Sequence, residues 1–149
     1  MIIATPFELW ITDLFGEANI SSLEDIKHNT VGFVVMMIVV WVFAAIGKEM
    51  LFRGYYLKWV AELMGNSNIA WTCSAIIMAA YFGVSHSYQG MSGIISIIFI
   101  SLINSIVFLK NRDNLGLLIL MHGIHDTILL TYLYLDVLNP ITAWIPNFL

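Results

Sequence analysis

The sequence predicts an all-α, multi-pass helical membrane bundle, and three observations lead to this class. Of the 149 residues, 60% are hydrophobic and 11% are charged, whereas a soluble domain is roughly 45–50% apolar and about 25% charged. The mean hydropathy is +0.87. Apolar runs long enough to span a bilayer recur along the chain, without the alternating pattern of a membrane barrel. Because only helices and closed barrels satisfy backbone groups in lipid, we expect these runs to be helical.

Composition also narrows the range of functions. The net charge is −4 and no basic run occurs, so nucleic-acid binding has little support. The single Cys73 excludes an internal disulfide, and its apolar surroundings favour a small buried hydrophobe. The first residues lack the positive region of a signal peptide, so insertion depends on the internal apolar segments. We therefore expect a multi-pass protein of the cell membrane, with the lipid bilayer as a partner.

The first part of the chain is expected to hold one span between two less apolar helices. Residues 1–29 form an amino-terminal interfacial segment, in which Pro6–Phe15 suits a short interfacial helix and Ser21 begins a capping-box pattern. Thr30–Gly47 is apolar on all sides and is the first predicted span. Met50–Met64 carries charges and is short for a span, which predicts a re-entrant or interfacial helix.

Three further spans are expected, which makes about four in all. They are Ile69–Ser85, Ile94–Leu109 and Leu115–Tyr134, and serines of the middle one can hydrogen-bond between helices. A glycine-rich break covers 86–93. Residues 30–135 are predicted to form the core and 136–149 an interfacial tail. Lys110 and Arg112 favour a cytoplasmic loop, but the other basic residues leave the orientation open.

Ionisable residues in or beside these spans are the strongest functional signal, because charges at membrane depth are costly and usually mark a site. Glu49 and Arg53 are four residues apart in the order that favours a helical ion pair. That pair can also serve only to neutralise a polar helix. His122 and Asp126 have the same spacing, which lets the carboxylate orient the imidazole. His125 is expected to point elsewhere. Polar groups converging from three helices can hold a water molecule.

These residues also carry a family resemblance. Lys48-Glu49-Met50-Leu51-Phe52-Arg53-Gly54 resembles a first motif, Glu-Glu-x-x-x-Arg, that often ends in Phe-Arg-Gly. Phe82-Gly83-Val84-Ser85-His86 matches a second motif, Phe-x-x-x-His, and His122-Gly123-Ile124-His125-Asp126 matches a third, His-x-x-x-Asn or Asp. The three occur in order between residues 41 and 132. The chain thus resembles the CAAX protease and bacteriocin-processing (CPBP/Abi) family of membrane proteins.

The resemblance implies an intramembrane endopeptidase that cleaves a membrane-associated or prenylated peptide or protein. In this family the first Glu of motif one and the His of motif two activate a water, which correspond to Lys48 and His86. His122 and Asp126 would stabilise the oxyanion, and Arg53 would hold Glu49. No cofactor is expected. Two histidines and a carboxylate make zinc possible, but a His-Glu-x-x-His string is absent and zinc is not favoured.

Lys48 is the departure from this pattern, because lysine cannot act as the same carboxylate base. Glu49 is rotated by about 100° around a helix from that position. Either Glu49 turns into the site and works with His86, or the water-activating group is lost. The second case predicts a catalytically impaired protein that binds a membrane peptide or confers bacteriocin immunity. A third possibility is a small channel or transporter with a histidine-lined pathway.

The depth of the histidines sets a further expectation. In a simple up-down layout His86 ends one helix, whereas His122 lies about 10 Å into the last span from the opposite side. For the two rings to meet, residues 87–93 must dip into the membrane or the third span must be displaced.

Overall fold

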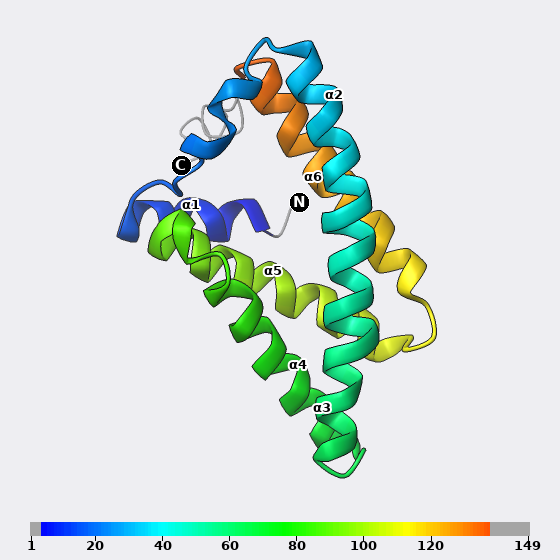
Figure 1. Ribbon diagram of the computed structural model, residues 1–149. Helices are drawn as coiled ribbons and strands as arrows, with labels where there is room; N and C mark the ends of the chain where they lie inside the picture. Colours follow the sequence, from blue (N-terminus) through cyan, green and yellow to red (C-terminus); the bar gives the residue numbers. More distant parts are fainter. Residues whose placement is uncertain (1–3, 138–149) are drawn as a thin grey trace.

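The computed structural model describes residues 4–137, and every regular element in that range is helical. This confirms the predicted all-α class (Figure 1). The predicted tail beyond residue 137 lies outside the described residues. The elements follow in this order: α1 (Ala4–Phe15), η1 (Ser21–Ile26), α2 (Thr30–Val39), η2 (Val40–Lys48), η3 (Met50–Leu57), α3 (Lys58–Leu63), α4 (Asn68–Val84), η4 (Ser87–Gln89), α5 (Gly90–Lys110) and α6 (Leu115–Tyr134).

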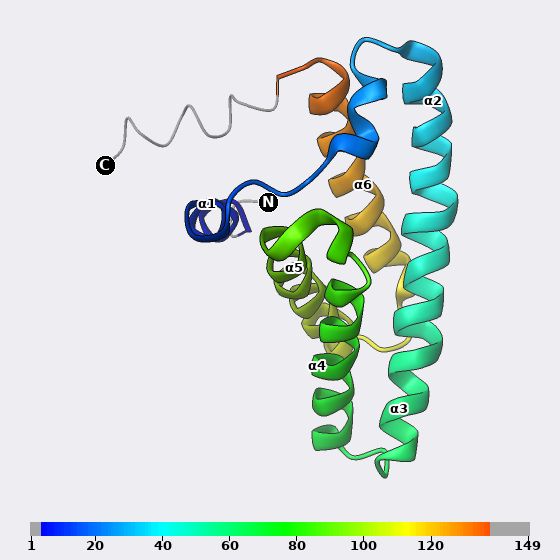
Figure 2. The ribbon, with the colours of Figure 1, turned by 60° about the vertical axis from the view of Figure 1, so that its left-hand side comes forward.

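The elements from α2 to α3 form one continuous helix, Thr30–Leu63, of 34 residues (Figure 2). The predicted break before Met50, with a separate re-entrant or interfacial helix after it, is therefore wrong. Glu49, at the junction, has helical dihedral angles of φ −66° and ψ −41°. No proline interrupts the segment, and its three glycines, at positions 32, 47 and 54, are tolerated inside a helix. Lys48, Glu49 and Arg53 find partners inside the bundle, so the helix can stay in the apolar region at these positions.

The middle of this long helix, η2 and η3, has π-helical hydrogen bonding. In an α-helix a step of four residues overshoots one turn by about 40°, so a series of such steps leaves the face on which it began. A π-helical turn takes in more residues and reduces this drift. The slower winding keeps a buried stripe on one face with a spacing of four: Ala45, Glu49, Arg53, Leu57 and Ala61.

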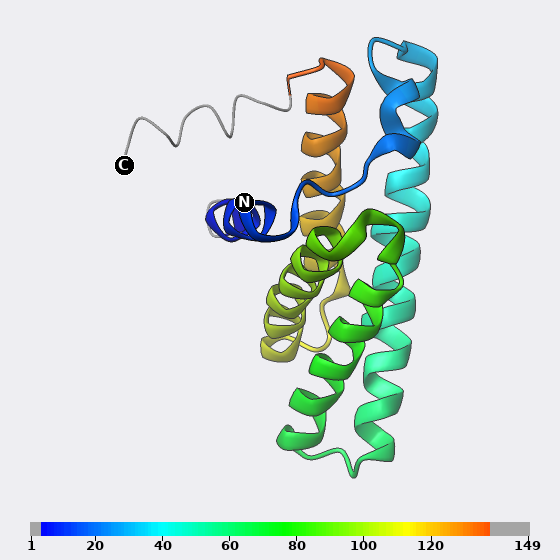
Figure 3. The ribbon, with the colours of Figure 1, turned by 90° about the vertical axis from the view of Figure 1, so that its left-hand side faces the viewer.

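α4 and α5 form a tight hairpin against the long helix. The Ser67 hydroxyl caps α4 by accepting from the Ala70 amide at 3.1 Å. A Cβ on Gly83 would lie 2.8 Å from the Ile94 carbonyl oxygen, so only glycine permits this approach. The tip of the hairpin lies about halfway along the long helix (Figure 3). The turn that carries His86 thus reaches the middle of the bundle, as the meeting of the two histidines requires.

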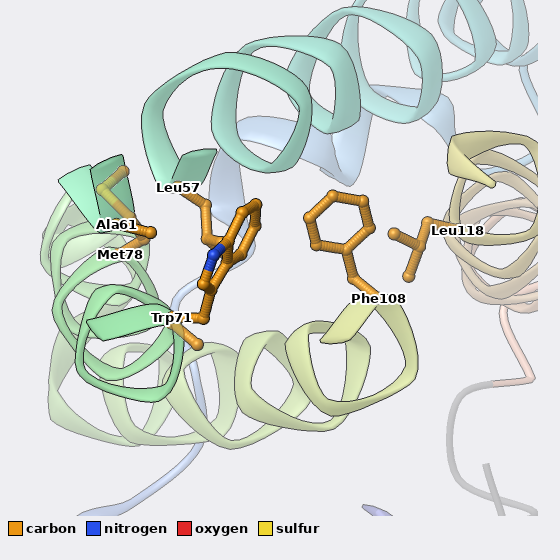
Figure 4. Packing of buried hydrophobic residues seen from close by; sticks show 7 residues of the cluster. Leu57, Ala61, Trp71, Met78, Phe108 and Leu118 are labelled. Carbon is orange, nitrogen blue, oxygen red and sulfur yellow. The ribbon is translucent and has the colours of Figure 1, made fainter. Parts of the chain in front are cut away.

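α6 packs along the amino-terminal part of the long helix and carries the third motif, His122 to Asp126. The Trp41 ring lies where a Cβ on Gly123 would be, at 2.7 Å, so the glycine lets the two helices approach. The Trp41 indole also donates to the Thr127 hydroxyl at 3.1 Å. The other end of the bundle holds the main apolar cluster (Figure 4), whose buried members are Leu57, Ala61, Trp71, Ala75, Met78, Phe108 and Leu118.

Within the described part of the chain, three helices are long and apolar enough to cross a membrane: Thr30–Leu63, Ser87–Lys110 and Leu115–Tyr134. α4 is a shorter apolar helix. Large apolar side chains such as Val31, Phe43 and Ile76 are exposed on the outside of the bundle. Side chains of this kind on an outer surface suit contact with lipid, so the fold is that of a helical membrane protein.

Candidate active site

Glu49 is the centre of a buried polar cluster, and its side chain is fully buried. The predicted pair with Arg53 is formed: the guanidinium Nη1 donates to Glu49 Oε1 at 3.0 Å. The other terminal nitrogen of Arg53 donates to the Ser101 hydroxyl at 2.7 Å and lies 3.4 Å from its carbonyl oxygen. Arg53 therefore fixes the Glu49 carboxylate and ties the long helix to α5.

His122 bridges two carboxylates. Its Nδ1 lies 2.7 Å from Glu49 Oε1, and its Nε2 lies 3.3 Å from Asp126 Oδ2. The predicted His122–Asp126 contact is thus present. Ionised carboxylates only accept hydrogen bonds, so a ring that serves both carries a proton on each nitrogen. Glu49 Oε2, in contrast, is buried and has no hydrogen-bond partner among the described residues.

His86 contacts Lys48, the residue that departs from the family pattern. Its Nδ1 donates to the Phe82 carbonyl oxygen at 2.7 Å, so Nε2 is the acceptor in the ring. The Lys48 ammonium lies 3.3 Å from this Nε2. The Phe82 ring lies beneath two cations, with Lys48 Nζ at 5.5 Å and the Arg53 guanidinium carbon at 5.2 Å from its centroid.

The four predicted site residues converge, although not all of them touch. Lys48 contacts His86, and its neighbour in the chain, Glu49, contacts His122. His122 in turn contacts Asp126. Glu49, His86, His122 and Asp126 therefore share one cluster, assembled by the long helix, the α4–α5 turn and α6. Within it Glu49 and His86 make no direct hydrogen bond in the described structure, because each is engaged by a different neighbour.

The cluster includes two residues that sequence reasoning did not place there. His125 Nδ1 lies 3.2 Å from Asp126 Oδ1, so the expectation that this ring points elsewhere is wrong. Asp126 can serve both histidines because its two oxygens diverge. Ser101 was expected only as one of several serines able to link helices. Arg53 itself was the sequence signal for this contact with Ser101. A buried guanidinium has five donors, and one carboxylate cannot satisfy all of them.

The arrangement does not suit zinc. Among residues 4–137 no group of three or more His, Cys, Asp or Glu side chains is placed to hold a metal ion. Glu49 Oε1 already accepts from Arg53 and His122, and both nitrogens of His86 have partners. A protein zinc site takes three or four such ligands with free lone pairs, and among the Glu49 and His86 atoms only Glu49 Oε2 has one.

Comparison with known proteins identifies the family. No curated protein and no solved structure matches the chain closely enough to count as similar. The family model described as Type II CAAX prenyl endopeptidase Rce1-like matches residues 30–128. That range holds all three motifs and the whole polar cluster, and it confirms the resemblance seen in the sequence. The chain therefore belongs to the Type II CAAX prenyl endopeptidase Rce1-like family and is a membrane protein of the CAAX-type intramembrane protease kind.

Proposed function

We propose that the chain is an intramembrane endopeptidase of the cell membrane that hydrolyses a membrane-associated or prenylated peptide, with Glu49 as the general base. One observation carries this proposal. Glu49 Oε1 is held by Arg53 and His122, whereas Oε2 is buried without a partner among residues 4–137. An unpaired buried acceptor is costly, and a water that donates to Oε2 relieves the cost. Such a water is placed beside a carboxylate that can take its proton.

The proposed reaction follows from these contacts. The oxygen of the water attacks the scissile carbonyl carbon while its proton passes to Glu49 Oε2. The carbonyl electron pair moves to the oxygen, and the Lys48 ammonium stabilises the resulting oxyanion. The carbon–nitrogen bond then breaks, and the proton held by Glu49 passes to the leaving amine. No cofactor takes part in these steps.

This scheme assigns roles that differ from those implied by the resemblance. His86 becomes the residue that positions Lys48, because its Nε2 accepts from the ammonium. His122 becomes the residue that positions Glu49, because both of its nitrogens are engaged by carboxylates and neither is free for an oxyanion. Asp126 holds His122 from the far side of the ring.

Turnover of a farnesylated peptide by the detergent-purified protein, with products identified by mass spectrometry, tests the proposal. Glu49→Gln keeps the shape of the side chain and removes the base, so kcat should fall by about 10²- to 10⁴-fold. Glu62→Gln is the matched control, because this exposed glutamate lies on the same helix outside the cluster. Equal turnover by wild type and Glu49→Gln would overturn the role of Glu49.

A second candidate function is the binding of a membrane peptide without cleavage, as in bacteriocin immunity. The contact between Lys48 and His86 favours it, because an imidazole nitrogen that accepts from an ammonium cannot also take a proton from water. Lys48→Glu separates the two candidates. Loss of turnover supports the lysine-assisted peptidase. Peptide binding without turnover in the wild type, with turnover gained in Lys48→Glu, supports the binding protein.

A further inference from the structure

A second polar feature lies away from the Glu49 cluster. A half-open cavity of about 300 Å³ is lined by residues of the long helix, the start of α4, the end of α5 and the start of α6. Two basic side chains, Lys58 and Arg112, and one acidic side chain, Asp113, line it. Its apolar wall includes Trp71 and Phe108, whose rings lie near one another in the cluster of Figure 4. The cavity thus combines an apolar wall with an excess of positive charge.

Arg112 is held in place for binding. Its guanidinium lies 4.2 Å from the centroid of the Trp71 ring, and its Nη2 donates to the Asn68 side-chain oxygen at 3.1 Å. Stacking and one hydrogen bond orient the planar fork but use only part of its five donors. The fork is therefore already ordered, and donors remain for an anion.

Lys58 supplies the second positive charge from the long helix. Its nearest carboxylate is Glu62 Oε1 at 4.0 Å, and both side chains are at least half exposed. An exposed pair at this separation is weak, so Lys58 can turn to a ligand at little cost.

The cavity lies at the level of the membrane surface. Residues 111–114 join the candidate spans Ser87–Lys110 and Leu115–Tyr134, so this loop must lie where the apolar region ends. Tyr55 and Trp59 are exposed on the neighbouring part of the long helix. Aromatic residues of this kind gather at the boundary between lipid and water. A group in the cavity therefore sits at the depth of lipid headgroups.

We propose that this cavity binds the headgroup phosphate of phosphatidylglycerol. Two cations against one carboxylate leave the charged lining at +1 (Lys58 and Arg112 against Asp113), which balances a headgroup with a single negative charge. Basic pockets between membrane helices bind lipid phosphates, and an arginine fork matches phosphate oxygens. Asp113 accepts from the glycerol hydroxyls, and the apolar wall contacts the ester region. This site is independent of the proposed peptidase.

Lipid titration of delipidated protein in detergent, followed by native mass spectrometry, tests the site. Phosphatidylglycerol should bind more tightly than phosphatidylethanolamine, and diacylglycerol should bind least. Arg112→Gln should weaken phosphatidylglycerol binding by about tenfold or more, since hydrogen bonds to charged groups are the strong ones. Lys27→Gln is the matched control, because this lysine lies at the opposite end of the helical bundle, where it pairs with Asp136.

Two results would overturn the proposal. One is equal binding of phosphatidylglycerol and diacylglycerol by the wild type. The other is binding of free glycerol 3-phosphate as tight as that of the lipid, which would assign the cavity to a soluble phosphate. If Arg112→Gln does not fold, Lys58→Gln repeats the test at an exposed side chain. Unchanged phosphatidylglycerol affinity in Lys58→Gln then counts against the site.

Discussion

The long helix buries two chemically opposite halves of one stripe. Glu49 and Arg53 belong to the first half, Leu57 and Ala61 to the second, and all four are at most 2% exposed. The first half is held by hydrogen bonds to α5 and α6, whereas the second packs against the cluster around Trp71. The winding of the helix therefore decides which residues are buried, but not what compensates their burial. Apolar burial is favourable in itself, whereas buried charge is tolerated only while every partner remains.

The largest effect is expected where one partner of the buried charge pair is removed. Arg53→Met leaves Glu49 buried without its guanidinium and should lower the free energy of unfolding by about 3–5 kcal/mol. Denaturant unfolding in detergent measures this loss. The double variant Glu49→Leu with Arg53→Met removes both charges and should recover most of the stability without recovering turnover. A single variant as stable as the wild type would show that the pair is not needed.

A substitution in the apolar half of the stripe should change stability through lost packing alone. Leu57→Ala removes buried methyl groups from the main cluster and should lower the free energy of unfolding by about 2–5 kcal/mol. Turnover per folded molecule should stay close to that of the wild type, which a peptidase assay below the unfolding transition measures. Leu51→Ala, at an exposed position on the same helix, should change stability little. A selective loss of turnover in Leu57→Ala would show that the two halves are coupled.

A smaller effect is expected at the anchor of Arg53 on α5. Ser101→Ala removes the acceptor at 2.7 Å and should cost about 1–3 kcal/mol of unfolding free energy, because a charged donor is left short of a partner. Thermal unfolding in detergent measures this loss of stability. Ser96→Ala on the same helix is the comparison. Equal losses at the two serines would mean that the hydrogen bond to Arg53 contributes nothing specific.

The smallest effect is expected at an exposed ion pair outside the stripe. Lys27 Nζ lies 3.0 Å from Asp136 Oδ1, and both side chains are more than a third exposed. Lys27→Gln should change the free energy of unfolding by less than about 1 kcal/mol. The difference should shrink as salt is raised, because exposed charges are screened. Unfolding measured at low and high salt checks this, and a large loss that salt does not alter would contradict it.

Spacing along one helix was enough to predict the parts of the site that lie on that helix. Glu49 with Arg53 and His122 with Asp126 are each four residues apart, and both contacts form. α6 begins and ends as expected, and the Asn114 side chain caps its first turn. In these cases the helical period and a local cap contain the necessary information.

Contacts between helices could not be predicted in the same way. Lys48 and His86 are 38 residues apart, and Glu49 and His122 are 73 apart. A helical period assigns a residue to a face but does not say which helix lies opposite. It also assumes a fixed winding, and the π-helical middle of the long helix departs from it. The catalytic roles of these residues stay predictions, because contact alone does not establish chemistry.

The length of the continuous helix has a consequence for the host membrane. Thirty-four residues at no more than about 1.5 Å each extend up to about 51 Å, and a hydrocarbon core is about 30 Å thick. Such a rod accommodates by tilting, and a thinner bilayer demands a steeper angle. The rod carries Glu49 while a shorter neighbour carries His122, so we expect acyl-chain length to change the angle between the two helices. We therefore expect the lipid composition of the membrane to alter the contact between the buried Glu49 carboxylate and His122.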